Sequence, residues 1–419
     1  MAKKQAHYVI IGNGVAAAGC IEGIRSVDTT SPITVISEEN HPVYCRPLIS
    51  YYLEGKTTLE KMNYRPADFY EKNGCTVLYG KKAASLDPAK KTVLLEDGTS
   101  LPYTDLCVAT GSSPFVPPTQ GYDTVERKFT FLTLDDALAL EQAITPDSRV
   151  LIVGAGLIGL KCAEGIAHRV GHLTVCDLAP RILSSILDDE CAGMMQKALE
   201  EQGIDLLLSN TVSEFRGNLA IMKGGQEVEF DVLVMAVGVK ANLSLVKDAG
   251  GEVNRGILVN AKMETSLKNV YAAGDCTEGD DISFGQKRVL AILPNAYIQG
   301  KCAGVNMAGA QEEHTKAIPM NSIGFFGTHA MTAGSYFSAD QGGELYEERT
   351  EDTLKRLFTK DGLLTGFILI GLTERAGIYT SLIREKTPLS TINFDLLKQV
   401  TTFSAFTPEE RAKKFGGVV

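Results

Sequence analysis

Short apolar runs recur through roughly the first 310 residues, and most are followed by a stretch of small residues with helical spacing. Four of these runs, at 8–11, 33–36, 150–153 and 173–176, are rich in Ile, Val and Leu. Continuous apolar runs of this length are typical of parallel strands that are buried on both faces. The alternation of strand and helix predicts an α/β fold with two doubly wound parallel sheets.

Two of the runs lead into glycine-rich turns that open helices. The turns contain Gly12, Gly14 and Ala17 in the first case and Gly154, Gly156 and Gly159 in the second. Such glycines let the backbone approach a pyrophosphate, and the helix N-terminus supplies partial positive charge. The next strand of each unit leads to an acid, Glu38 or Asp177, that can accept hydrogen bonds from a ribose 2′-hydroxyl. Two complete copies of this pattern predict that the chain holds two dinucleotides at once.

Composition excludes several other classes of protein. The net charge of −10 and the pI near 5.3 argue against nucleic acid or an anionic membrane as a partner. No apolar run approaches the length of a membrane span, and too little precedes the first strand for a signal peptide, so we expect a cytoplasmic location. No two of the nine cysteines are closer than fourteen residues, so the sequence predicts no metal or iron–sulfur site.

Later segments predict how the chain is divided. The proline cluster at 114–118 cannot continue a helix or a central strand, which predicts a crossover between domains. The strand pattern at 269–276 indicates a return to the first domain. The last hundred residues lack glycine fingerprints and contain alternating patterns at 355–359 and 364–369 around the turn Lys360-Asp361-Gly362, which predicts a smaller α+β domain.

The order of these motifs resembles that of the FAD-dependent pyridine nucleotide oxidoreductases, the family of glutathione reductase, NADH oxidases and ferredoxin reductases. The resemblance implies a glutathione-reductase-like fold, with FAD in a domain formed by 1–116 and 244–316, NAD(H) in 117–243, and a C-terminal α+β domain at 317–419. It also implies that Asp275 holds the ribityl chain of the flavin. Further cofactor-binding positions implied by the shared motifs are Ala109, Thr110, Gly111, Gly238 and Gly274.

The segment 41–56 bears on the subfamily. NADH oxidases and coenzyme A disulfide reductases carry one redox cysteine six residues before a helix end similar to Leu53-Glu54-Gly55-Lys56, and that position is Pro47 here. The segment instead resembles that of NADH:rubredoxin reductases and nitrite reductase flavin modules, which implies that Arg46, Pro47 and Ser50 lie beside the flavin. The expected activity is transfer of electrons from NADH to rubredoxin, a similar small redox protein or a small-molecule acceptor.

Two other functions stay open from the sequence. Cys45 lies two residues from the redox-cysteine position, and Arg46 could stabilise its thiolate. A catalytic Cys45 would make the protein an NADH oxidase, a peroxidase, or a coenzyme A disulfide or persulfide reductase. Alternatively, the chain is the NADH-oxidising subunit of a larger electron-transfer complex. The oligomeric state, monomer or homodimer, is also open.

Further positions bear on the charge near the flavin and on the choice of nucleotide. Many relatives have a lysine after the flavin-side serine and a glutamate two residues after the third glycine of the second turn, but this chain has Tyr51 and Lys161. One hypothesis is that Lys161 supplies the missing positive charge beside the flavin; the alternative is a solvated helix residue. Asn295 lies in the first turn of a predicted helix, and the family resemblance implies that the N-terminus of this helix faces the flavin pyrimidine ring, where it would stabilise negative charge. NADH preference rests on Asp177, with Arg181 close enough to weaken it.

Overall fold

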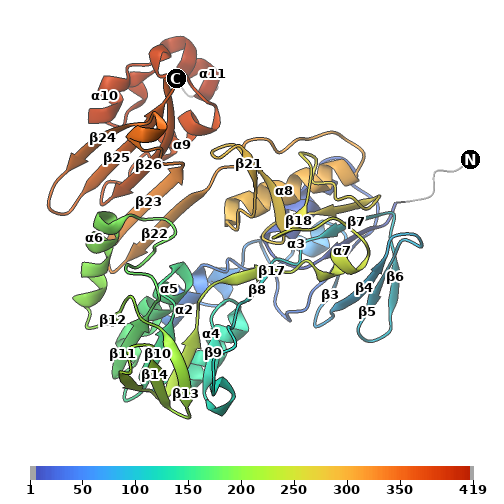
Figure 1. The fold of residues 1–419 in the computed structure, drawn as a ribbon. Coiled ribbons are helices and arrows are strands. Elements are labelled where there is room, and N and C mark those ends of the chain that lie inside the picture. Colours follow the sequence, from blue (N-terminus) through green and yellow to red (C-terminus); the bar gives the residue numbers. More distant parts are fainter. Residues whose placement is uncertain (1–5, 416–419) are drawn as a thin grey trace, which may run out of the picture. The chain divides into compact units, whose positions relative to one another are not determined.

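The computed structural model describes residues 6–415, which form two compact units (Figure 1). The dinucleotide unit comprises the described residues up to 180 together with 203–280 and 287–315. The C-terminal unit comprises 181–202, 281–286 and the described residues from 316 onward. No helix within residues 6–415 combines the length and apolar character that a bilayer crossing requires.

The first parallel sheet of the dinucleotide unit has the strand order β19-β7-β1-β2-β3. Its strands are β1 (Tyr8–Ile11), β2 (Ile33–Ile36), β3 (Cys75–Leu78), β7 (Asp105–Val108) and β19 (Val270–Ala272). All neighbouring strands run parallel, and β1 and β2 are buried along their whole length. The apolar runs therefore predicted these two strands correctly, because a strand covered on both faces has no polar side.

Helices α1 (Val15–Arg25) and α8 (Leu293–Met307) pack backbone against backbone on this sheet. Gly19 and Gly23 of α1 face α8, and Gly300 and Gly304 of α8 face α1. A Cβ atom at any of these four positions would lie only 1.9–2.3 Å from a backbone oxygen of the other helix. This close approach places α8 directly against Ala16, in the first turn of α1.

The second parallel sheet has the order β12-β11-β10-β16-β9. Its strands are β9 (Lys128–Thr130), β10 (Arg149–Val153), β11 (His172–Cys176), β12 (Asp205–Leu207) and β16 (Val232–Met235). The helices of this part are α4 (Leu134–Ala143) and α5 (Leu157–Ile166), and α2 (Leu48–Leu53) from the first part packs on both. The two doubly wound parallel sheets predicted from the sequence are confirmed.

Smaller elements complete the dinucleotide unit. Two three-stranded antiparallel sheets are formed by β4 (Ala83–Asp87), β5 (Thr92–Leu95) and β6 (Ser100–Pro102), and by β13 (Val212–Arg216), β14 (Leu219–Met222) and β15 (Glu227–Glu229). Further elements are α3 (Phe69–Lys72), α7 (Ser244–Asp248), β18 (Ile257–Leu258), β20 (Thr277–Asp281) and β21 (Gln286–Arg288).

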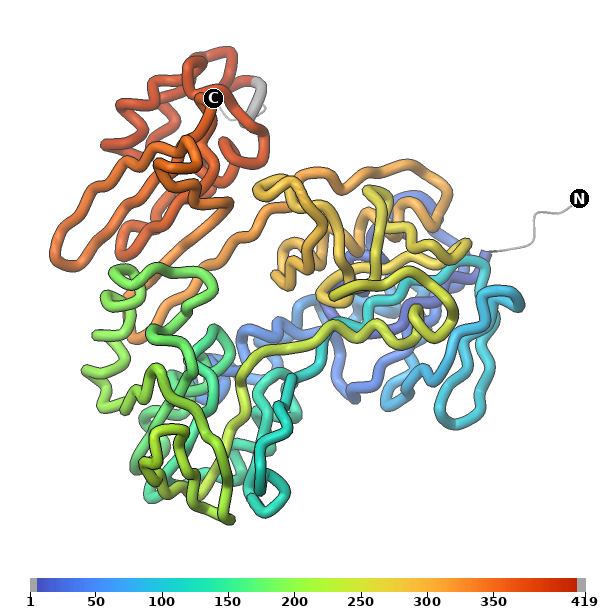
Figure 2. Tube along the Cα trace, in the orientation of Figure 1, coloured from blue at the N-terminus to red at the C-terminus, as the bar shows by residue number. Residues whose placement is uncertain are grey.

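Two antiparallel segments, β8 (Ser112–Pro114) and β17 (Val239–Ala241), connect the parts that carry the two parallel sheets, and Figure 2 shows them side by side. Asn242 ties the segments together, because its Nδ2 donates to the Thr110 carbonyl at 2.9 Å and its carbonyl accepts from Thr110 Oγ1 at 2.7 Å. The proline cluster at 114–118 lies where the chain passes from the first of these parts to the second.

The C-terminal unit is built on an antiparallel sheet of order β22-β23-β26-β25-β24. Its elements are β22 (Met320–Phe325), β23 (Thr328–Gly334), β24 (Glu344–Arg349), β25 (Leu354–Lys360), β26 (Leu363–Ile370), α9 (Gly377–Arg384), α10 (Phe394–Gln399) and α11 (Pro408–Phe415). The predicted turn joins β25 to β26, with positive φ at both Asp361 (52°) and Gly362 (72°). The α+β class is confirmed. Helix α6 (Asp189–Glu200), which follows β11 in the chain, also packs in this unit, on β22 and β23.

Candidate dinucleotide and flavin site

The first glycine of each phosphate-binding turn lies where only glycine fits. Gly12 has φ of +106°, and a Cβ atom there would lie 2.1 Å from the Ala109 carbonyl oxygen. Gly154 has φ of +118°, and its Cβ would lie 2.3 Å from the Ala236 oxygen. Each turn therefore passes against the end of a neighbouring strand with no space for a side chain.

The middle glycines, Gly14 and Gly156, face open space instead. Each is the N-cap of its helix, α1 or α5, and neither helix has a side-chain cap. A Cβ atom on either residue would meet no protein atom within 4 Å. The first backbone N–H groups of both helices are thus available to an anionic ligand, which is the arrangement that a dinucleotide pyrophosphate requires.

The third position differs between the two turns for a steric reason. A Cβ atom on Gly159 would lie 1.9 Å from the Gly154 carbonyl oxygen, so the second turn tolerates only glycine there. In the first turn Ala17 occupies the equivalent position and is fully buried.

Asp177 lies directly against the second turn. Its Oδ2 accepts a hydrogen bond from the Ala155 N–H at 2.7 Å, and its Oδ1 accepts one from the Ala179 N–H at 2.8 Å. Arg181 is directed elsewhere, since it donates to the Leu187 carbonyl and to Asp189. Glu38, the acid of the first unit, is exposed, with Lys82 3.4 Å from its carboxylate.

Asp275 follows β19 at a turn formed by Gly274, whose φ is +85°. Burial raises the pKa of the Asp275 carboxyl, and the Arg46 guanidinium works against that rise. Within residues 6–415 no hydrogen bond holds this carboxylate. A partly buried carboxyl group that no described residue hydrogen-bonds suits a ligand with hydroxyl donors of its own, such as the ribityl chain of FAD.

Arg46 belongs to a network that the sequence did not reveal. Its guanidinium donates to Glu39 and, at 3.2 Å, to the Leu132 carbonyl. The Tyr44 hydroxyl donates to Glu39 at 2.6 Å and accepts from the Leu134 N–H at 2.9 Å. Burial alone would lower the pKa of Arg46, but Tyr44 and Glu39 outweigh it and raise that pKa. The cation beside Asp275 is therefore permanent and fixed.

Pro47 and Ser50 place α2 against α5. Pro47 is the N-cap residue of α2, and the Ser50 hydroxyl donates to its carbonyl at 3.2 Å. A Cβ atom on Gly165 of α5 would lie 2.9 Å from the Ser50 carbonyl oxygen. Helix α2 therefore packs directly on α5, the helix that opens at the second turn.

The structure brings Tyr51 and Lys161 together across these two helices. Lys161 Nζ lies 4.5 Å from the centre of the Tyr51 ring and forms an ion pair with Glu164. The Lys161 side chain is only 18% exposed, and that of Glu164 is 6% exposed. Lys161 is thus largely buried, and its partner Glu164 is a residue that sequence reasoning missed.

Asn295 is buried in the first turn of α8, with Pro294 beside it. Its Nδ2 donates to the Leu290 carbonyl at 3.1 Å, and its Oδ1 lies 2.9 Å from His314 Nε2. His314 is itself buried. No local sequence pattern indicated this contact, because Asn295 and His314 are nineteen positions apart.

Cys45 is a half-buried free thiol. Burial raises its pKa, and the hydrogen bond from the Leu48 N–H offsets only part of that rise. Arg46 is engaged by Glu39 rather than by the sulfur. The thiol is therefore held neutral, whereas a nucleophilic cysteine requires a lowered pKa.

Replacing Cys45 with serine is expected to leave the rate of NADH oxidation within about twofold of the wild type, because a neutral thiol that relays no electrons can be exchanged for a hydroxyl. Steady-state kinetics with an artificial one-electron acceptor measure this rate. A loss of two orders of magnitude with FAD still bound would show that Cys45 takes part in the reaction.

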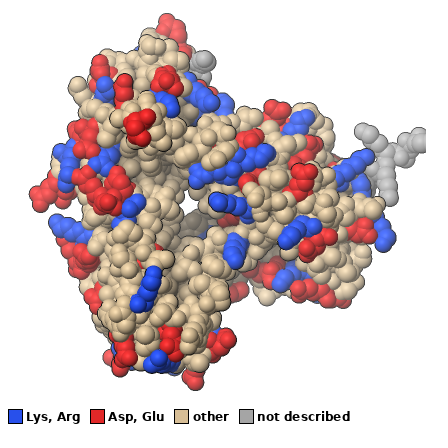
Figure 3. Space-filling view, viewed as in Figure 1, with Lys and Arg blue, Asp and Glu red and all other residues tan. Residues whose placement is uncertain are grey.

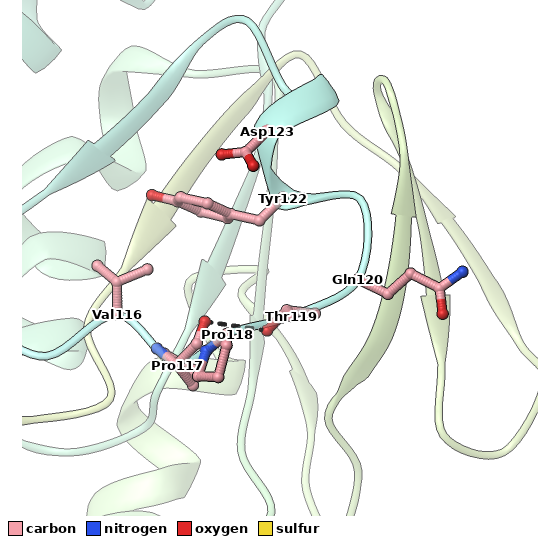
Figure 4. Close-up of a pocket in the computed structure, with 7 residues that line it drawn as sticks. All are labelled: Val116, Pro117, Pro118, Thr119, Gln120, Tyr122 and Asp123. Atoms are coloured by element: carbon pink, nitrogen blue, oxygen red, sulfur yellow. Dashed lines mark hydrogen bonds between the residues drawn. The ribbon is translucent and has the colours of Figure 1, made fainter.

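A pocket of about 610 Å³ lies on the connecting segment and contains none of the predicted site residues (Figure 4). It is lined by Val116, Pro117, Pro118, Thr119, Gln120, Tyr122 and Asp123. In the part of the chain that the structure describes, no group of three or more His, Cys, Asp or Glu side chains could hold a metal ion.

A model of the pyridine nucleotide-disulphide oxidoreductase family matches residues 6–300. The chain belongs to this family. It is 34% identical over 394 residues to subunit epsilon of the NADH-dependent phenylglyoxylate dehydrogenase of Aromatoleum evansii, a match that covers 91% of this chain and 92% of the relative. It is 27% identical over 310 residues to the rubredoxin-NAD(+) reductase of Pseudomonas putida, covering 72% and 80% of the two chains.

The fold is also that of a solved oxidoreductase. The crystal structure of the covalent putidaredoxin reductase–putidaredoxin complex matches with a TM-score of 0.86 at 21% identity and covers 100% of both chains. Family membership and these relatives establish an NADH-dependent flavoprotein oxidoreductase whose cofactors are FAD and NADH. The two phosphate-binding turns fit these two cofactors, because both leave open space at the middle glycine.

Proposed function

We propose that this flavoprotein takes hydride from NADH and passes the electrons from FAD to a small redox protein of the rubredoxin kind, without a cysteine relay. The observation that carries the proposal is the segment 45–50: proline occupies the redox-cysteine position, and the nearby Cys45 thiol has a raised pKa. The name of the Pseudomonas relative supports rubredoxin as the class of acceptor.

In this proposal the chain's own residues bind and orient the cofactors. Gly14 and α1 hold the pyrophosphate of FAD, Asp275 holds its ribityl hydroxyls, and Gly156 with Asp177 holds NADH. When bound, FAD supplies the chemistry of accepting a hydride and returning electrons singly or in pairs. Arg46, fixed by Glu39, and the N-terminus of α8 supply positive charge around the site.

A second candidate is favoured by a specific match. The phenylglyoxylate dehydrogenase subunit is matched along 92% of its own length. The match covers 91% of this chain, so it extends into the C-terminal unit, and that much of the chain is comparable to a subunit of a larger NADH-dependent enzyme. In this case the electron acceptor is a partner subunit rather than a diffusible carrier.

An anaerobic panel of acceptors tests the proposal. Purified, FAD-loaded protein is reduced with NADH and mixed with rubredoxin, ferredoxin, oxygen or coenzyme A disulfide in a stopped-flow instrument. We expect rubredoxin to reoxidise the flavin at least about a hundredfold faster than oxygen or the disulfide. Fast reoxidation by the disulfide alone would contradict the proposal. Copurification of stoichiometric partner subunits, with no reaction toward free carriers, would favour the second candidate.

Replacing Lys161 with methionine is expected to make the flavin midpoint potential more negative, because a nearby cation stabilises the anionic reduced form. A shift of about 30 mV would correspond to about 1.4 kcal/mol for this two-electron couple. Spectroelectrochemical titration measures the potential.

The ion pair provides a matched control for the Lys161 prediction. Glu164→Gln removes the opposing charge and should shift the potential in the positive direction, while the double variant should lie near the wild type. If Lys161→Met and Glu164→Gln both leave the potential unchanged, Lys161 has no electrostatic role at the flavin.

A further inference from the structure

A network of hydrogen bonds joins the two parallel sheets of the dinucleotide unit at their carboxyl edges. Glu39 follows the end of β2 in the first sheet, and Leu132 follows the end of β9 in the second. Each of these edges also carries a glycine-rich turn, because β2 runs parallel to β1, and β9 and β16 run parallel to β10. Ligands of such sheets bind at the carboxyl ends of the strands. The network therefore connects the two edges at which FAD and NADH are proposed to bind.

Tyr44 lies at the centre of this network. Its hydroxyl donates to Glu39 Oε2 at 2.6 Å and accepts from the Leu134 N–H at 2.9 Å. Leu134 is the first residue of α4, and the first N–H groups of a helix have no partner within the helix. Glu39 Oε1 accepts from Arg46, which also donates to the Leu132 carbonyl at 3.2 Å. One carboxylate beside the first sheet thus holds two side chains, and both of them reach the start of α4.

The centre of the network is shielded from water. Tyr44 is only 7% exposed, and burial raises the pKa of its hydroxyl, with Arg46 working against that rise. A further contact at this end of α4, from His41 Nε2 to Asp135 Oδ1 at 2.7 Å, is exposed, since 62% of the Asp135 side chain is accessible. Figure 3 shows acidic and basic side chains beside one another at many places on the viewed face, and exposed pairs of this kind contribute little. The buried hydroxyl is therefore the contact to test.

We propose that Tyr44 is a positioning residue for hydride transfer: by joining Glu39 to the start of α4, it sets the carboxyl edge of the second sheet against that of the first. The proposal rests on the binding of FAD and NADH to these two edges proposed above. In the reaction the C4–H bond of NADH breaks, and a hydride, which is one proton with two electrons, passes to the flavin and leaves NAD⁺. Such a step needs reacting atoms about 3–3.5 Å apart, and a displacement of about 1 Å can lower its rate about a hundredfold.

Tyr52, on α2, provides a matched control at the other end of α4. Its hydroxyl donates to Glu141 Oε2 at 2.9 Å. Glu141 stands near the end of α4, about 10 Å along the helix from Leu134 and away from the carboxyl edge. Replacing either tyrosine with phenylalanine removes one hydroxyl that holds α4, but only Tyr44→Phe removes a contact at the carboxyl edges.

The main test compares Tyr44→Phe with Tyr52→Phe in FAD-loaded protein. Stopped-flow reduction of the flavin by NADH needs no acceptor, and it separates the rate at saturating NADH from the Kd for NADH. We expect Tyr44→Phe to lower the saturating rate about tenfold, with the Kd and the bound FAD within about twofold of the wild type. The loss is partial because Arg46 still reaches Leu132. Tyr52→Phe should leave the rate, the Kd and the bound FAD within about twofold of the wild type.

Hydrogen exchange of the same FAD-loaded proteins tests the contact without catalysis. The Leu134 N–H loses its acceptor in Tyr44→Phe, so peptides that span the start of α4 should exchange faster than in the wild type. The same peptides of Tyr52→Phe should exchange as in the wild type. Mass spectrometry of peptic fragments measures both.

Three results would overturn the inference. The first is a saturating rate in Tyr44→Phe within about twofold of the wild type, and the second is an equal fall in both variants, which would reflect general loosening of α4. The third is unchanged hydrogen exchange at the start of α4. A wild-type flavin that NADH failed to reduce would instead contradict the proposed function. Should Tyr44→Phe not fold, Glu39→Gln decides by the same criteria, because Arg46 and Tyr44 bind separate carboxylate oxygens and glutamine keeps only one of them.

Discussion

Replacing Gly14 with valine is expected to yield protein that purifies without FAD and shows no flavin absorbance. A Cβ atom at this position would meet no protein atom within 4 Å, so we expect the fold to accept a small branched side chain there. The same space is where the FAD pyrophosphate must approach the N-terminus of α1. The valine would therefore exclude the ligand rather than disturb the protein. Absorbance of the purified variant and titration with added FAD measure the loss, which we expect to exceed about a hundredfold in affinity.

The thermal midpoint of the FAD-free protein is the control for this variant. Gly14→Val and wild-type apoprotein should unfold at nearly the same temperature, since no buried contact is lost. A variant that binds FAD with wild-type affinity would show that the first turn is not the FAD site.

Gly156→Val, the same substitution in the second turn, is expected to leave FAD in place and to raise the KM for NADH at least about tenfold. The middle glycines of the two turns are equivalent, because Gly156 is the N-cap of α5 without a side-chain cap and, like Gly14, faces open space. The predicted difference arises only from which dinucleotide each turn binds. Steady-state kinetics with ferricyanide, together with the ratio of flavin to protein absorbance, measure both quantities.

The two valine variants control each other. If Gly156→Val lost FAD while Gly14→Val kept it, the assignment of the turns would be reversed. If both lost FAD, the substitutions would be acting through the fold, and neither would report on a single site.

The parallel sheets could be predicted from the sequence because their signals are local. The run at 8–11 became β1 without a change of boundary, and the turn at Asp361 and Gly362 has the two positive φ values that its residue types favour. Both rest on short-range rules: a fully buried strand is apolar throughout, and a tight hairpin needs residues that accept a left-handed backbone.

The supporting residues of the site could not be predicted in this way. Glu39 stands beside Glu38 in the sequence, and nothing local shows that it, rather than its neighbour, binds Arg46. His314 meets Asn295, and Arg356 meets α6, through contacts between elements far apart along the chain. Such partners depend on how the elements pack, which hydrophobic periodicity does not specify.

The position of Lys161 is an intermediate case. The sequence showed that a lysine stands where relatives have a glutamate, but it did not show the partner. The structure places Lys161 between the Tyr51 ring and Glu164. The charge at this position is thus balanced by a buried carboxylate, and for that reason the double variant is the informative one.

Anaerobic titration of the FAD-loaded protein with dithionite tests most directly whether electrons pass from the flavin to the acceptor without a sulfur relay. We predict complete reduction at two electrons per FAD, with no change in the number of free thiols. Uptake of four electrons per FAD, and its return to two in the Cys45→Ser variant, would contradict this mechanism and assign the chain to the cysteine-dependent reductases.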